Sequence, residues 1–286
     1  MLLMRSAWVR WRLHPLRRPW KTKKTRFRFP WQPDPWHRDS TAYHDGMSGS
    51  FLVDFDQPIP LFPLVGVALF PQTVQPLHVF ETRYRQMIED CMAHTVDGDL
   101  SKSGPIALAV LEKGLVGADS VGSPPLKPIV CIGRILKNHL LPDGRRNILV
   151  HGVCRALIRS VDEPDDDRLY RVGDLRPIES PLAEAPSPVV RQALKRLLHG
   201  DQLNRMHAAE AVREWVDQEE VPIETLIEMA SFVLVKDERL RYQLLQEPDP
   251  SERARIVYGE LHHIDRLVAR CDLQGWREWP KGLSWN

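Results

Sequence analysis

The chain has 286 residues, of which 43% are hydrophobic and 27% are charged. These proportions are typical of a soluble globular protein with a buried core, and they exclude a chain that is disordered throughout. The formal net charge is +1, but eleven Lys/Arg and three acids within residues 1–46 give that segment +8 and leave −7 for the remaining 240 residues. The body of the protein is therefore mildly acidic, which argues against a general nucleic-acid binder.

Residues 1–46 also contain five of the nine tryptophans and five prolines, without a sustained period. This composition predicts a disordered basic tail. Basic residues interleaved with tryptophan equally suit an arm that binds nucleic acid or an anionic surface. A third interpretation is that the true start is Met47, which stands just before the first fold-like residues. The sequence leaves all three interpretations open.

The four cysteines, Cys91, Cys131, Cys154 and Cys271, are widely spaced and form no Cys-x-x-Cys pair. Each lies among apolar neighbours, so we expect reduced thiols, with no disulfide framework, no metal site and no cofactor. No window reaches the roughly 18–20 apolar residues of a membrane span. No apolar stretch follows the first basic residues as it does in a secretory signal. We therefore predict a cytoplasmic protein without a membrane partner.

Short apolar runs interrupted by prolines fill residues 58–80. Proline cannot donate to a sheet ladder, so this pattern predicts brief strands joined by tight corners. Apolar residues then recur at helical spacing from Tyr84 to Met92, which predicts a helix with Glu81 or Thr82 at its N-cap.

Two runs rich in β-branched residues, 129–135 and 147–158, flank the sequence Leu141-Pro-Asp-Gly144. Proline presets φ and glycine accepts a positive φ, so these residues predict a β-hairpin. A further strand is predicted over 170–175. Beyond residue 186 the spacing is helical in five segments separated by prolines, namely 189–198, 208–216, 223–235, 239–245 and 253–268. Asp249-Pro-Ser251 predicts the start of the last helix.

Three blocks of the first apolar segment resemble the signature of the LON N-terminal domain family, the substrate-binding part of Lon-type ATP-dependent proteases. The matching blocks are Pro60–Leu64, Leu69–Pro71 and Pro76–Tyr84, with Val79 and Thr82 as mild departures. The hairpin block is similar to the family as well. The signature positions, which we expect to be mainly structural, are Pro63, Phe70, Pro71, Pro76, His78, Phe80, Glu81, Arg83, Tyr84, Gly133, Asp143, Gly144, Gly152 and Arg155.

The resemblance implies an α+β fold over about residues 58–271. Residues 58–180 would form a small PUA-like β-barrel subdomain with one helix, and residues 187–271 a helical-bundle subdomain. Residues 272–286 would form a tail that contains three tryptophans and has no counterpart in the family.

Catalysis is not expected from this sequence. ATP hydrolysis by a Lon-type ATPase needs a G-x-x-x-x-G-K-[ST] loop, and neither that loop nor a Ser–Lys peptidase domain is present in the 286 residues. The adjacent His262 and His263 point to different faces of a helix and cannot share a metal ion. Asp165–Asp167 is interpreted as a solvated loop. By the resemblance, His78 and Glu81 hold a strand-to-helix corner.

The resemblance implies a non-catalytic module that recognises unfolded or damaged polypeptides in protein quality control. Extended peptides can pair with sheet edges while apolar pockets accept their side chains. The candidate peptide-binding residues are Phe62, Val79, Phe80 and Tyr84. The implied partners are unfolded polypeptides and a separate protease or chaperone that the module would serve as an adaptor. The alternative is RNA binding by the PUA-like barrel through the basic N-terminal arm, against which the acidic body argues.

Overall fold

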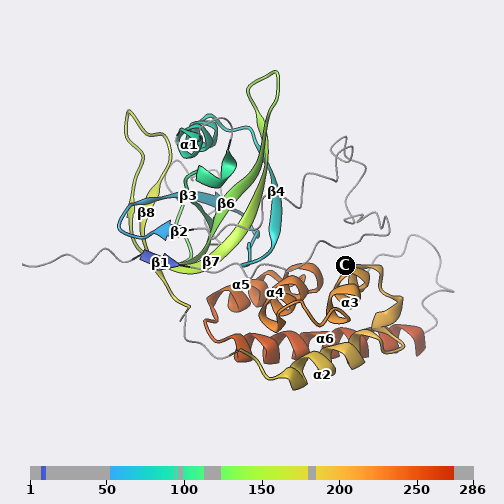
Figure 1. Cartoon of the computed structure of the whole chain (residues 1–286). Coiled ribbons are helices and arrows are strands. Elements are labelled where there is room, and N and C mark those ends of the chain that lie inside the picture. The colour runs from blue at the N-terminus through green and yellow to red at the C-terminus, as the bar shows by residue number, and fades with distance from the viewer. Residues whose placement is uncertain are drawn as a thin grey trace, which may run out of the picture. The chain divides into compact units, whose positions relative to one another are not determined.

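The computed structural model describes residues 8–10, 52–93, 95, 99–112, 124–179 and 185–273. The chain divides into two compact units, Met1–Leu182 and Ala183–Asn286. In the described residues the first unit holds all the strands and the second only helices (Figure 1). The predicted α+β class is therefore confirmed. The predicted N-terminal tail, apart from residues 8–10, lies outside the described residues, and so do Met47 and residues 274–286.

The first unit begins with two short strands, and its longest strands are β6 and β7. Its elements in chain order are β1 (Trp8–Arg10), β2 (Leu52–Asp54), β3 (Ile59–Leu64), β4 (Val74–Val79), α1 (Thr82–Met92), η1 (Leu100–Lys102), β5 (Ile106–Val110), β6 (Ile129–Leu140), β7 (Arg146–Asp162) and β8 (Val172–Pro177).

The main sheet of the described residues has the strand order β4-β7-β6-β5-β3-β8. β7 is 17 residues long. It pairs with β4 and β6 towards its start and with β8 towards its end. Because β8 also pairs with β3, the strands β3, β5, β6, β7 and β8 close into a ring, as a small barrel requires. The β3–β5 pairing is parallel, whereas β1 and β2 form a separate antiparallel pair.

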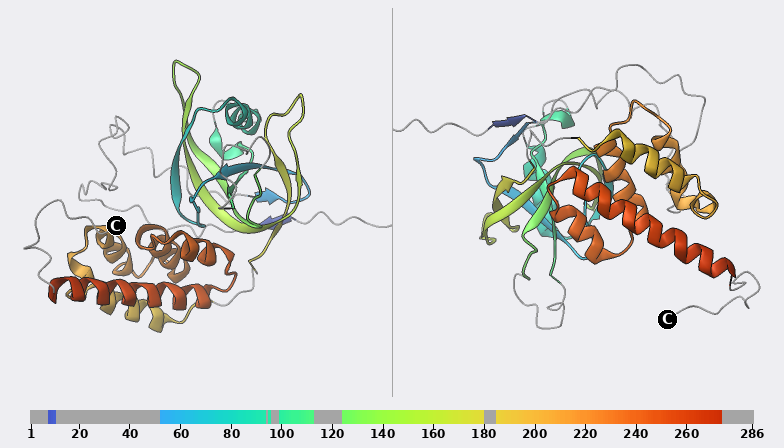
Figure 2. Two further views of the ribbon diagram at one scale, coloured as in Figure 1. Left: turned by 180° about the vertical axis from the view of Figure 1, so that it is seen from behind. Right: turned by 90° about the horizontal axis from the view of Figure 1, so that it is seen from below.

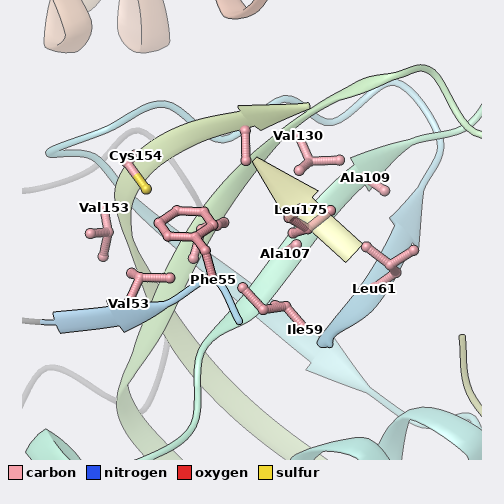
Figure 3. Packing of buried hydrophobic residues seen from close by; sticks show 12 residues of the cluster. Val53, Phe55, Ile59, Leu61, Ala107, Ala109, Val130, Val153, Cys154 and Leu175 are labelled. Carbon is pink, nitrogen blue, oxygen red and sulfur yellow. The ribbon is translucent and has the colours of Figure 1, made fainter. Parts of the chain in front are cut away.

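Every strand of this ring contributes to one cluster of buried side chains, most of which are labelled in Figure 3. The ring is narrow, and two of the positions that fill it are the small residues Ala107 and Ala109 of β5. The other ring-strand members are Ile59, Leu61, Val130, Ile132, Val153, Cys154, Ala156 and Leu175, and Val53 and Phe55 of the β2 region complete the cluster.

α1 covers the opposite face of the sheet. Neighbouring residues of a strand point to opposite faces. Leu61 therefore joins the ring cluster, while the ring of Phe62 packs at a tilt against that of Tyr84 in α1, with centroids 4.6 Å apart. The buried residues of α1 are Tyr84, Met87, Ile88 and Cys91, in agreement with the predicted helical spacing. Glu81 occupies the predicted N-cap position, but its carboxylate binds Arg83 in place of the helix backbone.

The predicted hairpin is confirmed. β6 and β7 are antiparallel as far as the pair Leu140–Arg146, and Gly144 in the turn between them has a φ of +82°. Further along the same pair, Gly133 and Gly152 lie opposite each other. A Cβ atom on Gly152 would lie 2.0 Å from the Phe70 carbonyl oxygen, so only glycine fits this close approach.

The second unit is helical, as predicted, with small shifts of the helix ends. Its elements are α2 (Pro188–Leu198), η2 (Leu203–Arg205), η3 (His207–Ala209), α3 (Glu210–Val216), α4 (Ile223–Leu234), α5 (Glu238–Gln246) and α6 (Pro250–Leu273). The last helix starts where the sequence indicated, because the Asp249 carboxylate accepts a hydrogen bond from the Ser251 amide at 2.8 Å. No helix in the described part of the chain has the length and apolar character of a membrane span.

Arginines bind the carbonyl groups at the C-terminal ends of three of these helices. Arg191 donates to Val216 at the end of α3 and to Gln218 beyond it. Arg241 donates to Phe232 in the last turn of α4 and to Val235 at its C-cap. Arg253 donates to Glu247 and Pro248 after α5. Carbonyl groups at the C-terminal end of a helix lack the amide partners of the helix interior. A guanidinium there donates hydrogen bonds to them and interacts favourably with the helix dipole.

Candidate functional site

α1 lies between two arms of the first unit. The hairpin arm (residues 139–147) joins β6 to β7, and the β7–β8 arm (residues 163–171) joins β7 to β8. Figures 1 and 2 show α1 between these arms from two opposite sides.

Side chains one helical turn apart attach α1 to the hairpin arm. Arg85 Nη1 donates to the Asp143 carbonyl at 3.5 Å, and Glu89 Oε1 lies 2.8 Å from Arg146 Nη2. Within the arm, the Asp143 carboxylate accepts from the amide and the side chain of Arg145. The backbone hydrogen bond from Arg145 contributes most to lowering the pKa of Asp143. The predicted signature residues Asp143 and Gly144 therefore shape the turn that α1 contacts.

A second pair on α1, again four residues apart, attaches the helix to the β7–β8 arm. Gln86 forms two hydrogen bonds, donating to the Asp167 carbonyl at 2.7 Å and accepting from the Leu169 amide at 2.9 Å. Asp90 accepts from the Tyr170 hydroxyl at 2.8 Å. Burial, followed by this bond to Asp90, raises the pKa of Tyr170. One helix thus positions both arms, because residues i and i+4 lie on the same side of it.

The corner between β4 and α1 holds the predicted residues His78 and Glu81 in separate contacts. His78 Nδ1 lies 2.6 Å from Asn147 Oδ1, and its Nε2 lies 3.4 Å from Arg145 Nη1. Glu81 instead binds Arg83, with a shortest separation of 2.5 Å. The two side chains are not joined as an acid–base pair, and each has a partner of its own.

The four candidate peptide-binding residues differ in exposure. Phe62, Val79 and Tyr84 are buried, whereas 61% of Phe80 is exposed. Phe80 lies between β4 and α1, and its ring stacks on His78 at a centroid distance of 6.2 Å. Of these four residues, Phe80 alone exposes most of its side chain to solvent.

Two further exposed residues of this region were not predicted from the sequence. Leu140 on the hairpin arm is 56% exposed, and Leu169 on the β7–β8 arm is 41% exposed. We call Phe80, Leu140 and Leu169 the apolar rim. Leu140 pairs with Arg146, which in turn pairs with Val79 next to Phe80, so three adjacent strands bring Leu140 and Phe80 to one end of the sheet. The sequence does not single out the two leucines, because Leu140 is followed by Leu141 and Leu169 by Tyr170.

The edge of β4 is poorly suited to pairing with an incoming strand. Among the described residues β4 has β7 as its one strand neighbour. Pro76 in its middle has no amide hydrogen, and its carbonyl already accepts from the Gln75 side chain at 3.0 Å. Proline on an edge strand blocks edge-to-edge pairing. The rim side chains are therefore a better candidate site than this edge.

The other signature residues belong to the scaffold. Arg155 is fully buried, and its Nη1 lies 2.7 Å from Glu179 Oε1. Its guanidinium also lies 6.0 Å from the ring centre of Phe70, whose carbonyl accepts from the Thr73 hydroxyl. Pro71 is buried as well, and Pro63 pairs with Ala109 in the β3–β5 ladder.

The described residues contain no group of three or more His, Cys, Asp or Glu that could hold a metal ion. In the acidic loop, Asp165 Oδ1 accepts from the amides of Asp167 and Arg168 and so closes a turn. His262 contacts the ring of Tyr258 edge-on at 4.7 Å. All four cysteines are free thiols, and burial raises the pKa of Cys91 to about 12.

Comparison with known proteins bears on the family and the fold of this chain. The family model described as the ATP-dependent protease La (LON) substrate-binding domain matches residues 58–263. Among solved structures, the chain is similar to a Lon N-terminal domain protein from Xanthomonas campestris, with 20% identity and a TM-score of 0.47 over 69% of this chain and 94% of that chain. It is also similar to the N-terminal domain of the Mycobacterium avium complex Lon protease, with 17% identity and a TM-score of 0.51 over 72% and 98% of the two chains.

At these identities the structural likeness concerns the fold alone. The search of curated proteins found no match. The family match is the decisive finding, since it extends over residues 58–263 and so over more than half of the sequence. This chain belongs to the LON substrate-binding domain family.

Proposed function

We propose that this protein is a non-catalytic module that binds unfolded or damaged polypeptides through the apolar rim. The family supports polypeptide binding in general. The observation that carries the more specific proposal is the exposure of Phe80, Leu140 and Leu169 at the end of the unit where α1 fastens both arms. Exposed apolar side chains favour apolar partners. Because the two arms are already held in place by α1, less conformational entropy is lost when a partner binds.

The expected binding is weak and permissive. Burying a large apolar side chain contributes roughly 1.5–3 kcal/mol, from which the cost of association must be subtracted. A rim of three such residues therefore holds many different segments without strong sequence preference. This behaviour suits an adaptor that passes clients to a separate protease or chaperone, which is the partner we propose.

The test is a titration of the full chain with a fluorescently labelled, permanently unfolded protein and with its folded counterpart, without ATP and at two salt concentrations. We expect saturable, salt-tolerant binding of the unfolded form only. Phe80→Ala and Leu140→Ala should each weaken it by about threefold to tenfold. Val189→Ala is the matched control, since Val189 is 67% exposed in the helical unit. Absence of binding, or equal losses for all three variants, would contradict the proposal.

RNA binding by the basic segment 1–46 is the competing hypothesis. Its support is the charge of +8 on that segment. RNA affinity that falls steeply with salt and is lost on deleting residues 1–46 would favour it, because phosphate contacts release counterions. Salt-tolerant binding of unfolded protein by the same deletion variant would favour the rim.

A further inference from the structure

The first unit contains an open pocket of about 250 Å³ that is separate from the apolar rim. Its apolar walls are Leu126, Ile158 and Val161 together with three prolines of the segment 124–128. The polar lining residues are Arg171 and Glu163. Because Leu126, Ile158 and Val161 also pack against the ring cluster, the bottom of the pocket is continuous with the buried core.

The pocket is held in shape by backbone hydrogen bonds. The amide of Lys127 donates to Val110 at the end of β5, and the amide of Glu112 donates to Pro125. On the other side, the Ile158 amide of β7 donates to Pro128 at 2.8 Å. The segment 124–128 is thereby fixed between two strands of the ring, so the pocket exists before any ligand arrives. A preformed pocket binds with a smaller loss of conformational entropy.

Both signs of charge lie at this pocket. Arg171 Nε is 3.1 Å from Glu163 Oε2, and Arg171 Nη1 donates to the Pro124 carbonyl at 2.7 Å. The Arg171 side chain is only 9% exposed, whereas that of Glu163 is 54% exposed. A guanidinium only donates hydrogen bonds and a carboxylate only accepts them. The paired charges therefore favour neither a simple anion nor a simple cation.

The size of the pocket also limits the ligand. Pockets for drug-sized molecules usually measure roughly 300–1,000 Å³, and this one is smaller. It accommodates one large apolar side chain, and the neighbouring donor and acceptor match the C=O and N–H of a peptide group. Anchor side chains in preformed pockets are the usual centres of binding energy in protein interfaces.

We propose that this pocket is an anchor site for a single large apolar side chain of a bound polypeptide, with Arg171 and Glu163 facing the adjoining peptide groups. The inference rests on the proposed function and deepens it, because it assigns a second contact to the same client chain. The ligand class is an aliphatic or aromatic residue within a peptide. Fatty acids and amines, which supply only one sign of charge, match the paired lining less well.

The first experiment uses the full chain with ¹³C-labelled methyl groups on isoleucine, leucine and valine. N-acetyl-leucine N-methylamide, hexanoate and hexylamine are the probes. We expect the amide probe to shift the methyl signals of Leu126, Ile158 and Val161, and the other two probes to shift them far less. Unchanged signals with the amide, or equal shifts with all three probes, would overturn the assignment.

The second experiment fills the pocket. Val161→Phe should weaken binding of the labelled unfolded protein by about tenfold, while Val189→Phe in the helical unit should leave it unchanged. Leu126→Phe, on another wall, replaces Val161→Phe if circular dichroism shows that the latter is unfolded. Wild-type affinity in the filled variants would overturn the anchor site and leave the proposed function standing. Shifts with the amide probe but no binding of unfolded protein would overturn the proposed function and leave a peptide-group pocket.

Discussion

Phe80 and Tyr84 show how differently two aromatic residues of one signature are used. Phe80 is mostly exposed at the corner before α1, whereas Tyr84 is buried against Phe62. Burial raises the pKa of the Tyr84 hydroxyl, which is the expected effect of removing a phenolate from water. Their spacing in the sequence places both near the start of a helix. The helical spacing that begins at Tyr84 predicts that this side chain is buried. It does not indicate that Phe80, which precedes the helix, faces solvent, because that depends on tertiary packing.

Among the glycines that the structure describes, Gly152 is the one at which an added Cβ atom would meet the closest backbone contact. A Cβ atom there would lie 2.0 Å from the Phe70 carbonyl oxygen, whereas one on Gly259 of α6 would meet nothing within 4 Å. We expect Gly152→Ala to lower the free energy of unfolding by about 3 kcal/mol or more. Gly259→Ala should raise it by about 0.5–1 kcal/mol. Urea unfolding of both variants and of the wild type measures these free energies. Similar free energies of unfolding for Gly152→Ala and Gly259→Ala would contradict the prediction.

His151 makes stability depend on pH. It is buried between Val74 of β4 and Arg134 of β6, and neither ring nitrogen has a hydrogen-bond partner among the described residues. Burial, with the charge of Arg134 second, lowers the pKa of His151 from 6.5 to about 4. The folded state therefore favours the neutral ring. The contribution of this neutral ring to the free energy of unfolding is fully present above pH 6.5 and is lost as the pH falls towards 4.

Between pH 6.5 and pH 4 we expect the free energy of unfolding to fall by about 3 kcal/mol, because folding lowers the pKa of His151 from 6.5 to about 4. Unfolding free energies between pH 7 and pH 4 should fall less steeply in His151→Gln than in the wild type. His139→Gln, at an exposed position of β6, controls for the substitution itself. An unchanged slope in His151→Gln would show that other groups cause the acid sensitivity.

At the scale of elements, α1 is the part that organises the rim. Helical spacing from Tyr84 to Met92 predicted a helix with Glu81 or Thr82 at its N-cap, and the structure confirms this helix as Thr82–Met92. The hairpin was predicted from Leu141-Pro-Asp-Gly144 and is also confirmed, because its turn chemistry is local. The contacts of α1 with the two arms were not predicted. They join Gln86 to Leu169 and Glu89 to Arg146, positions separated by tens of residues, about which local spacing says nothing.

Removing the Gln86 side chain tests this organisation. In Gln86→Ala the Leu169 amide loses its acceptor, so we expect its hydrogen exchange to accelerate by about fivefold, in line with roughly 1 kcal/mol for one hydrogen bond. Arg85→Ala, which affects the hairpin arm, should leave the exchange of that amide unchanged. Equal exchange in the wild type and Gln86→Ala would mean that the β7–β8 arm is held by other contacts.

At the scale of the whole molecule, each of the two units has its own buried residues. The ring cluster belongs to Met1–Leu182, and the buried leucines of α2, α4 and α5 belong to Ala183–Asn286. We therefore expect residues 1–182 and residues 183–286, produced separately, each to unfold cooperatively. Circular dichroism should show a helical spectrum for the second fragment. A non-cooperative melt of either fragment would indicate that its core needs the other unit.

The sequence by itself determined the α+β fold class, the helix after β4, the β-hairpin, the helical second half and the family. These depend on spacing, turn residues and short motifs that act within a few residues of one another. Only the tertiary structure decided that β7 pairs with three strands and closes a ring, and that Arg155 is neutralised by Glu179. It also decided that Phe80, Leu140 and Leu169 remain exposed while Val79 is buried. Exposure and ring closure depend on contacts between residues far apart in the chain, and local pattern does not encode these contacts.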